Sequence, residues 1–428
     1  MTYLQTVDYL YSRLPMFTRV GASAFKKDLD NTIALCNALG NPQNKYKTIH
    51  IGGTNGKGST SHMLAAILQQ VGYKTGLYTS PHLKDFRERI RVNGKMVAKK
   101  FVIDFVRQQE QLISEIEPSF FEVTVGMAFS YFEQAQVDVA VIEVGLGGRL
   151  DSTNIILPDL SVITNISLDH TNMLGNTFGK IAFEKAGIIK QNTPIVIGER
   201  HPETDPVFIK KAKEQNANLV FAEDELSANH ISKLANTLKL DIFQKDQVLL
   251  KGLQLDLTGT YQLKNILTVI DAVKELRKIG YQIPDEAIYQ ALKNVKKLTG
   301  LQGRWQTLAK KPLIICDTGH NKAGISEVIQ NISQTPHQNL HMVIGMVKDK
   351  DISAVLALLP KNANYYFSQP NLERALSVKE LAEQASNFSL KGKTFNTVEE
   401  ALAAAKNQAK DDDLIFVGGS TFVVAEII

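Results

Sequence analysis

A glycine-rich turn between a strand-like and a helix-like segment constrains this chain more than any other feature. The apolar run Thr48–Ile51 comes first, the turn Gly52–Ser59 (GGTNGKGS) follows, and an amphipathic segment continues through Leu64–Val71. Glycines let backbone N–H groups turn toward a phosphate, and the start of a helix adds partial positive charge. Lys57 adds a mobile cation. Strand, turn and helix in this order therefore predict a phosphate-binding loop whose ligand is a nucleoside triphosphate.

This loop departs from the general phosphate-loop pattern at two positions. Ile51 stands where that pattern has its first glycine, and Gly58 stands where it has the serine or threonine that binds the metal. The hydroxyl of Ser59 is thereby displaced by one residue. A plain glycine-rich turn without a ligand is the alternative interpretation of the same segment.

Length and composition favour a two-domain enzyme of the cytoplasm. The 428 residues exceed one ordinary core, and a net charge of +4 is too small for a nucleic-acid-binding surface. No apolar stretch reaches membrane-spanning length, and the N-terminus lacks the pattern of a secretory signal. Cys36 and Cys316 lie far apart in the sequence, and we expect both to be buried and reduced. We therefore expect a soluble protein with neither a nucleic-acid nor a membrane partner.

Strand-like and helix-like segments alternate along the first 300 residues, which predicts an α/β fold with a mainly parallel sheet. After the first strand we expect strands at Gly76–Thr79, Arg89–Val92, Asp138–Val144 and Leu160–Ile166, and a capped helix from Ser119 through Phe132. Asn93-Gly94 predicts a hairpin turn. The polar stretch Ala222–Asp246 fits either an inserted loop or an irregular pair of strands.

The alternating pattern restarts near residue 300 and predicts a second, smaller α/β unit. Its expected strands are Leu313–Cys316, Met342–Gly345, Tyr365–Phe367 and Leu414–Val417, and its expected helices include Ile352–Leu359 and Leu381–Ala385. We place the domain boundary between residues 298 and 299. Residues 1–298 are then the ATP-binding domain, and residues 299–428 are the smaller domain.

Polar side chains follow several predicted strands at the edge where open α/β sheets bind ligands. Glu143 is the lone carboxylate of a buried strand, so we expect a cation beside it, most simply Mg²⁺. Ser80 directly follows a strand and is either a metal ligand that replaces Ser59 or a simple turn residue. His170 follows the neighbouring strand and is either catalytic or structural.

The second predicted domain has a similar edge. Asp317 and His320 lie in a turn that follows a strand, where nucleotides are often held. Arg304 lies between the two predicted domains and fits either a salt bridge or a phosphate clamp. By composition alone, Lys185 is an ordinary solvated lysine on a helix.

Short motifs rich in glycine and polar residues are spread over nearly the whole chain. They are Leu39–Pro42, Gly53–Ser59, Tyr78–His82, Glu88–Ile90, Val141–Asn154, Leu168–His170, Glu184–Lys190, Gly303-Arg304, Asp317–Asn321, Lys348–Asp351 and Gly418–Ser420. In order and spacing they resemble the folylpolyglutamate synthase/dihydrofolate synthase family of the Mur ligase superfamily. That family has glycine after the loop lysine, as this chain has at Gly58.

The resemblance implies an N-terminal P-loop ATPase domain, a C-terminal Rossmann-like glutamate-ligase domain, and an active site in the cleft between them. The residues it implies for ATP are Thr54, Asn55, Gly56, Lys57, Gly58, Ser59, Asn265, Arg304, Asp317 and His320. Ser80 and Glu143 would bind one Mg²⁺, and His170 would bind a second. Lys185 resembles the family's carbamylated lysine, whose added carboxylate helps the second metal. Lys57, His170 and Lys185 would thus be the catalytic residues.

The resemblance also implies where the acceptor substrate binds. Phe121, Thr124 and Asp151 match positions near the pterin. The segment Phe121–Thr124 (FEVT) departs from the commoner aromatic-Glu-Phe-x-Thr form, so the preferred pterin stays open.

The implied reaction joins a carboxylate to an amine. The acceptor's carboxylate attacks the γ-phosphate of ATP, which gives an acyl phosphate and ADP, and the amine of L-glutamate then displaces phosphate. Dihydropteroate, reduced folates or both are the implied acceptors, and family precedent favours a monomer. We expect the domains to close over the acyl phosphate, because water would hydrolyse it.

Two alternatives remain at this point. One is a Mur-type ligase for another carboxylate acceptor, although only 51 residues precede Gly52, too few for the UDP-binding domain of such enzymes. The other is a nucleotide-binding ATPase module with no second substrate.

Overall fold

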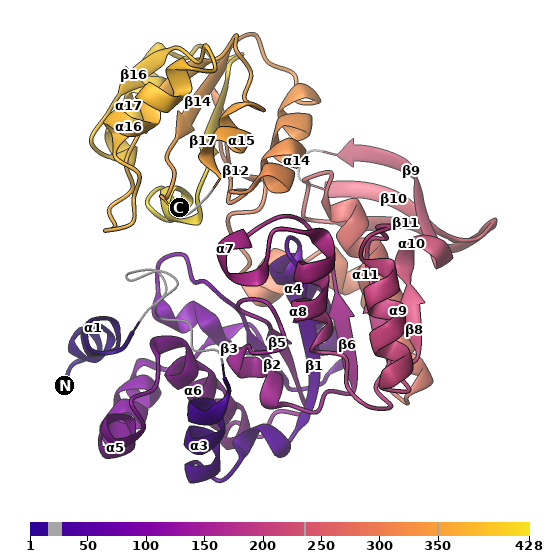
Figure 1. The fold of residues 1–428 in the computed structure, drawn as a ribbon. Helices are drawn as coiled ribbons and strands as arrows, with labels where there is room; N and C mark the ends of the chain where they lie inside the picture. Colours follow the sequence, from indigo (N-terminus) through magenta and orange to yellow (C-terminus); the bar gives the residue numbers. More distant parts are fainter. Residues whose placement is uncertain (16–27, 235–236, 349–350) are drawn as a thin grey trace. The chain divides into compact units, whose positions relative to one another are not determined.

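The computed structural model describes residues 1–15, 28–234, 237–348 and 351–428. Their contacts divide the chain into two compact units (Figure 1). The first unit comprises Met1–Ser167, Thr171–Leu257 and Gln262–Leu301, and the second comprises Leu168–His170, Thr258–Tyr261 and Gln302–Ile428. The second unit therefore includes two short segments from the earlier part of the sequence. The functional boundary between residues 298 and 299 stays a prediction, and residues 349 and 350 of the motif Lys348–Asp351 lie outside the described residues.

An eight-stranded sheet forms the centre of the first unit, in the order β4-β3-β2-β5-β1-β6-β7-β8. Its strands are β1 Lys47–Gly52, β2 Thr75–Tyr78, β3 Ile90–Val92, β4 Lys95–Met96, β5 Val139–Glu143, β6 Leu160–Ile163, β7 Ile195–Ile197 and β8 Leu219–Phe221. Within this order, β2, β5, β1, β6, β7 and β8 are parallel to one another. β3 is antiparallel to β2, and β3 and β4 pair antiparallel around the predicted turn at Asn93-Gly94. The predicted α/β class is confirmed.

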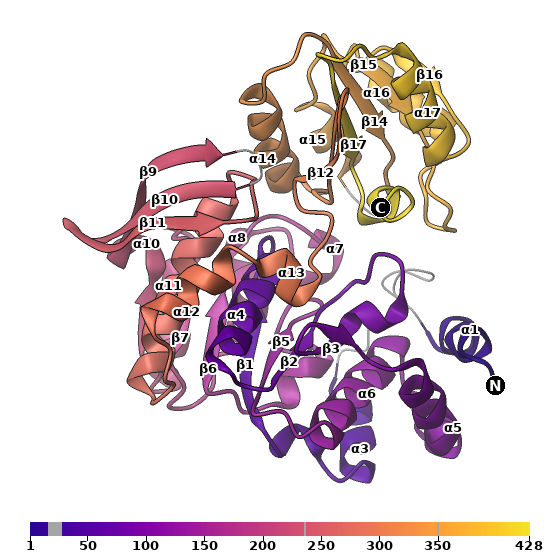
Figure 2. The same cartoon turned by 180° about the vertical axis from the view of Figure 1, so that it is seen from behind.

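Helices cover both faces of this sheet, as the two views in Figures 1 and 2 show. The α-helices of this unit are α1 Tyr3–Arg13, α3 Asp30–Ala38, α4 Lys57–Val71, α5 Lys99–Ile116, α6 Phe120–Gln134, α7 Thr171–Leu174, α8 Phe178–Ala186, α9 Asp205–Glu214, α10 Ala222–Glu225, α11 Gln262–Lys278, α12 Asp285–Leu292 and α13 Val295–Thr299. In β5, Val139 and Val141 pack with residues of α4 and α11, whereas Ala140 and Ile142 pack with residues of α6. The alternation arises because successive side chains of a strand point to opposite faces.

The stretch Ala222–Asp246 is a short helix followed by strands of a separate sheet. β9 Leu226–Leu234, β10 Thr237–Gln244 and β11 Gln247–Leu255 are antiparallel, in the order β11-β10-β9. Register shifts interrupt both pairings. Of our two alternatives, the irregular strand pair is correct, and the sequence did not indicate the third strand.

The second unit has a six-stranded sheet in the order β12-β13-β17-β14-β15-β16. Its strands are β12 Gln306–Lys310, β13 Leu313–Asp317, β14 Leu340–Ile344, β15 Asn364–Phe367, β16 Gly392–Thr394 and β17 Leu414–Gly418, and its helices are α14 Lys322–Ser333, α15 Ile352–Leu356, α16 Val378–Ser386, α17 Val398–Gln408 and α18 Thr421–Ala425. The four predicted strands are confirmed. The short edge strands β12 and β16 were missed because they bury little apolar surface.

Three further findings bear on the sequence predictions. β6 ends at Ile163, not at the predicted Ile166, because the next residues turn to bond the glycine-rich loop. Cys36 and Cys316 are buried and unpaired with each other, as expected. Among the described residues, none of the helices combines the length and the apolar character needed to cross a membrane.

Candidate active site

The glycine-rich loop between β1 and α4 has a backbone that only glycine accommodates. Gly53 has a φ of +134° and Gly56 a φ of +85°. A Cβ atom at Gly53 would lie 1.9 Å from Oγ1 of Thr164, and one at Gly56 would lie 2.3 Å from Oδ1 of Asn265. Because L side chains rarely adopt these φ values, and neighbours fill the space, both glycines are required for the turn.

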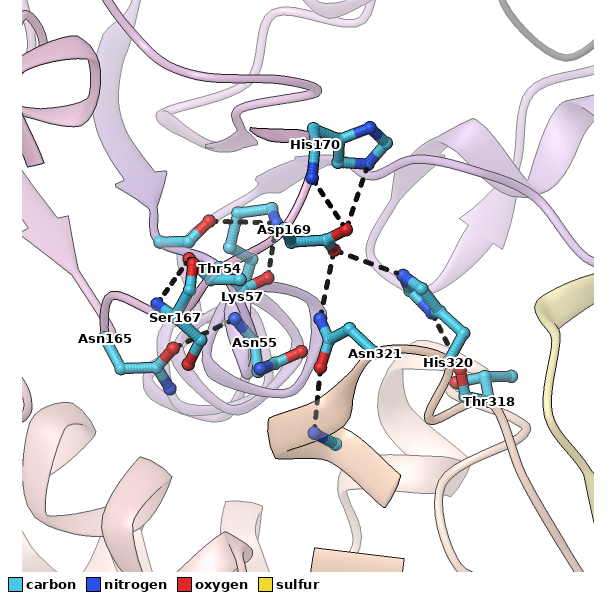
Figure 3. A network of polar contacts seen from close by, with 12 residues as sticks. Thr54, Asn55, Lys57, Asn165, Ser167, Asp169, His170, Thr318, His320 and Asn321 are labelled. Atoms are coloured by element: carbon cyan, nitrogen blue, oxygen red, sulfur yellow. Dashed lines mark hydrogen bonds and ion pairs between the residues drawn. The ribbon is translucent and has the colours of Figure 1, made fainter. Parts of the chain in front are cut away.

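The loop is anchored to the end of the neighbouring strand β6 (Figure 3). The backbone N–H of Thr54 donates to the carbonyl of Asn165 at 2.9 Å, and that of Asn55 donates to Oδ1 of Asn165 at 3.0 Å. The hydroxyl of Thr54 accepts from the backbone N–H of Ser167 at 3.0 Å. Asn165 was not among our candidates, because the predicted strand extended to Ile166 and so included it.

Two lysines converge on one carbonyl of this loop. Lys57 is the first residue of α4, and its Nζ lies 3.1 Å from the carbonyl oxygens of both Gly53 and Thr54. Lys185 is only 4% exposed in α8, and its Nζ donates to the Gly53 carbonyl at 2.8 Å. The ammonium group of Lys57 beside a helix N-terminus makes this point of the loop attractive to an anion.

Ser59 and Asn265 belong to the contact between α4 and α11. The buried hydroxyl of Ser59 accepts from Nε2 of Gln262 at 3.1 Å. The side-chain amide of Asn265 donates to Oε1 of Gln262 at 2.8 Å. Gln262 therefore holds both predicted residues beside the loop, and sequence analysis missed it because it lies about 200 residues from Ser59.

Glu143 and Ser80 are neighbours at the ends of β5 and β2. Glu143 is the last residue of β5 and is 4% exposed, and its Oε2 accepts from the backbone N–H of Ser80 at 3.0 Å. A buried carboxylate next to a hydroxyl is an oxygen donor set that suits Mg²⁺. In the described part of the chain, no three His, Cys, Asp or Glu side chains group as metal ligands. Mg²⁺ needs no such cage, since it keeps waters and binds substrate phosphates.

Asp169 links two histidines in the second unit (Figure 3). Its Oδ1 accepts from the backbone N–H of His170 at 2.9 Å and lies 3.9 Å from Nε2 of that ring. Its Oδ2 accepts from Nδ2 of Asn321 at 3.0 Å and lies 3.5 Å from Nε2 of His320. The segment that carries His170 thus contacts the turn that carries His320.

Asp317, the carboxylate at the start of that turn, accepts three hydrogen bonds. It accepts from the backbone N–H of Trp305 at 2.7 Å, from the Tyr261 hydroxyl at 2.6 Å, and from the backbone N–H of Gly319 at 2.8 Å. Burial raises the pKa of Asp317, and these hydrogen bonds oppose the shift. Arg304 donates to the hydroxyl of Thr318 in the same turn.

Two of the three residues predicted for the acceptor substrate, Phe121 and Asp151, lie beside Gly145 in the first unit. A Cβ atom at Gly145 would lie 2.5 Å from Cζ of Phe121 and 3.2 Å from Oδ2 of Asp151, so the ring and the carboxylate flank one point of the backbone. Thr124 is fully buried, and its hydroxyl donates to the Phe120 carbonyl at 2.7 Å. Burial raises the pKa of Asp151. An aromatic ring beside a carboxylate suits a flat ligand with N–H donors.

Comparison with known proteins identifies the family. The Mur ligase middle domain matches residues 51–273, and the Mur ligase glutamate ligase domain matches residues 303–421. The folylpolyglutamate synthase of Lacticaseibacillus casei is 32% identical over 98% of this chain and 96% of its own length. The chain belongs to the folylpolyglutamate synthase/dihydrofolate synthase family.

Solved structures of folylpolyglutamate synthases share the fold of this family member throughout. The Escherichia coli FolC in complex with DHPP and ADP is 30% identical, with a TM-score of 0.87 over 100% of this chain and 97% of that one. A bifunctional folylpolyglutamate synthase/dihydrofolate synthase with Mn, AMPPNP and L-glutamate bound is also 30% identical, with a TM-score of 0.85 over 100% and 97%. The protein is accordingly an ATP-dependent ligase of this family, as the motifs indicated.

Proposed function

We propose that this enzyme adds L-glutamate both to dihydropteroate and to reduced folates, with ATP as cosubstrate. One observation carries the proposal: Lys57 and Lys185 meet at the Gly53 carbonyl, beside a loop whose backbone only glycine accommodates. This arrangement suits a polyphosphate. The ligands named for the solved relatives, ADP, AMPPNP, DHPP and L-glutamate, are those that such a reaction requires.

The roles of individual residues are part of this proposal. In residues 1–298, the ATP-binding domain, the nucleotide contacts are Thr54, Asn55, Gly56, Lys57, Gly58, Ser59 and Asn265. In residues 299–428, the glutamate-ligase domain, they are Arg304, Asp317 and His320. Phe121, Thr124 and Asp151 face the acceptor. Thr124 would act as a hydrogen-bond acceptor or through its methyl group, because its hydroxyl proton is engaged by the Phe120 carbonyl.

Two Mg²⁺ sites complete the proposed chemistry. Ser80 and Glu143 would hold one ion and His170 the other, and Mg²⁺ supplies charge neutralisation at the phosphates when bound. Carbamylation of Lys185 would leave one N–H on Nζ, so its bond to the Gly53 carbonyl is compatible with the modified side chain. A carbamate signal in ¹³C NMR after exchange with labelled bicarbonate, lost in Lys185→Arg, would test this modification.

The chain's own residues supply positioning and charge. Phosphoryl transfer needs little covalent help from the protein, so an ordered loop and a fixed cation account for much of the catalysis. Lys57 balances charge on the transferred phosphoryl group, and the N–H groups at the start of α4 orient it. A monomeric state and a location in the cytoplasm remain predictions from the sequence.

ADP release measured with separate acceptors tests this function. We expect release only when ATP, L-glutamate and a pteroyl acceptor are all present, with dihydropteroate and with tetrahydrofolate alike. Reactions that lack one component are the controls. Release with only one acceptor would limit the enzyme to a single folate activity. Release without any acceptor, or only with a UDP-linked acceptor, would contradict the proposal.

A further inference from the structure

Three buried side chains form a hydrogen-bonded chain from the phosphate-loop strand to Asp151. His50 lies in β1, two residues before Gly52, and its Nε2 is 2.8 Å from Oγ1 of Thr153. The same Oγ1 donates to Oδ1 of Asp151 at 2.5 Å. His50 and Thr153 are 0% exposed and Asp151 is 2% exposed. None of our sequence arguments assigned a role to His50 or Thr153.

The directions of these hydrogen bonds follow from the donors and acceptors. The carboxylate of Asp151 already accepts from the backbone N–H groups of Leu146 and Thr153, so it acts as an acceptor toward the Thr153 hydroxyl as well. The single proton of that hydroxyl is thereby used, and its oxygen must accept from His50. His50 is thus the tautomer with a proton on Nε2. Burial, together with the nearby charge of Lys190, lowers the pKa of His50 to about 3, so the ring is neutral at physiological pH.

The second ring nitrogen of His50, Nδ1, indicates that the hydrogen bonds from His50 to Asp151 do more than stabilise the fold. Nδ1 is buried and has no hydrogen-bond partner among the residues that the structure describes. An unsatisfied buried acceptor costs free energy, so an apolar side chain of similar size would suit folding at least as well. The histidine is therefore better explained by what it does for Thr153 than by stability.

The chain of contacts fixes one carboxylate oxygen and leaves the other for a ligand. Oδ1 of Asp151 receives both donors of Thr153. Oδ2 receives the N–H of Leu146 and lies next to the point of Gly145 that Phe121 also flanks. The backbone N–H of Gly145 also interacts with this carboxylate, as the weakest of its donors, so Oδ2 is the less firmly bound oxygen and the one that an N–H of a ligand can reach beside the aromatic ring.

We propose that His50 and Thr153 are positioning residues that fix the Asp151 carboxylate for an N–H donor on the flat heteroaromatic end of the acceptor substrate. This inference rests on the proposed function. Loss of the Thr153 hydroxyl leaves Oδ1 with only the backbone N–H of Thr153 and lets the carboxylate rotate away from Phe121. The effect falls on acceptor binding and leaves the ATP side of the reaction unchanged.

Thr153→Val and Thr153→Ser form the first test, because valine keeps the shape and serine keeps the hydroxyl. We expect Thr153→Val to raise the KM and the Kd for dihydropteroate about tenfold, the size expected for a lost hydrogen bond to a charged group. The KM for ATP should stay constant, and Thr153→Ser should resemble the wild type. Equal acceptor affinity in the two variants, or an equal rise in the KM for ATP, would overturn the inference.

His50 provides a second test that does not depend on how Thr153→Val folds. Glutamine can place an N–H near the position of Nε2, whereas methionine cannot, so His50→Gln should retain acceptor affinity and His50→Met should lose it. The thermal midpoint of His50→Met should not fall. Adding His50→Met to Thr153→Val should have no further effect on acceptor affinity, because the link is already broken.

The wild-type assay separates the two proposals. If the wild type releases no ADP with any pteroyl acceptor, the proposed function fails and the positioning role fails with it. If the wild type is active but His50→Met lowers thermal stability and leaves acceptor affinity unchanged, only the positioning role is refuted.

Discussion

The turns that follow β1 and β13 each connect a buried parallel strand to a helix, but their polar groups are satisfied differently. α4 begins after Gly56 with no side chain of the described residues capping it. α14 begins after Asn321, whose Oδ1 accepts from the backbone N–H of Gly324 at 2.8 Å, and Asp317 accepts from Gly319 in the same turn. The first turn leaves helix N–H groups for a ligand, whereas the second satisfies its own.

The two helix starts therefore differ in what stabilises them, although Asp317 and His320 of the second turn are also proposed to contact the nucleotide. A helix start without a side-chain cap gains its hydrogen bonds when an anion binds, so its stabilisation depends on the ligand. A capped helix start contributes to folding whether or not a ligand is present. We therefore expect substitutions in the first turn to change activity most, and those in the second turn to change stability most.

Lys57→Ala should lower kcat/KM more than any other substitution considered for the two turns. Both Lys57 and Lys322 are the first residues of their helices, but only Lys57 follows an uncapped turn. Loss of a fixed cation at a transferring phosphate costs about 3–4 kcal/mol of transition-state stabilisation, or roughly 100- to 1000-fold in kcat/KM. Steady-state ADP release measures this effect. Lys322→Ala is the matched control. An equal loss of kcat/KM in that variant would contradict the assignment of the two turns to different roles.

Gly56→Ala should give the next largest effect. The substitution forces a positive φ on alanine and places its Cβ against Asn265, which costs about 1–3 kcal/mol. Gly319→Ala in the second turn has no positive φ, and its Cβ would lie 3.2 Å or more from other atoms, so it should cost less than about 1 kcal/mol. The measurements are the nucleotide affinity and the free energy of unfolding by chemical denaturation, compared between the two variants. Equal losses in the two variants would argue that both turns are equally constrained.

Asn321→Ala should destabilise the second unit by about 1 kcal/mol, the usual value of a helix N-cap. The amide of Asn321 also donates to Asp169, so removal of the side chain affects both contacts. Asn321→Ser retains a capping oxygen and should recover most of the stability. Thermal unfolding followed by circular dichroism is the measurement. A stable Asn321→Ala with reduced nucleotide affinity would reverse our assignment of the second turn.

Asp413→Asn should change the unfolding free energy of the second unit only at low pH, which is the smallest change that we predict. Burial raises the pKa of Asp413, but hydrogen bonds from Lys410 and Asn339 outweigh burial and hold the pKa at about 2. Because the folded pKa lies below the ordinary value of 3.8, the stabilisation is present above pH 4 and is lost as the pH falls toward 2. Asp413→Asn should flatten this part of the curve of unfolding free energy against pH. An unchanged acid slope would show that other carboxylates dominate.

Local sequence patterns predicted most elements and the position of the loop. The strands β1, β2 and β5, the capped start of α6 at Ser119 and the hairpin turn at Asn93-Gly94 all follow from short-range rules. The early end of β6 did not, because the apolar Ile166, two polar residues after Ile163, extended the predicted strand. Its termination depends on Asn165, which bonds a loop more than 100 residues away in sequence.

Side-chain partners were the least predictable part of the site. Thr124 fits the acceptor motif by sequence, yet its hydroxyl proton satisfies a carbonyl of its own helix. Gln262, which holds both Ser59 and Asn265, belongs to no motif that we recognised. Periodicity predicts which face of an element is buried, but it does not specify which polar atoms meet there.

Local sequence patterns were enough to predict the order of strand, glycine-rich turn and helix, and the motifs were enough to identify the family. Only the tertiary structure decided that Lys185 reaches the Gly53 carbonyl across 132 residues, and that His50 and Thr153 connect β1 to Asp151. The two kinds of feature differ in how far apart in the sequence the interacting residues lie. Glycine conformation and helix caps act within a few residues, whereas these contacts depend on the order of strands in the sheet.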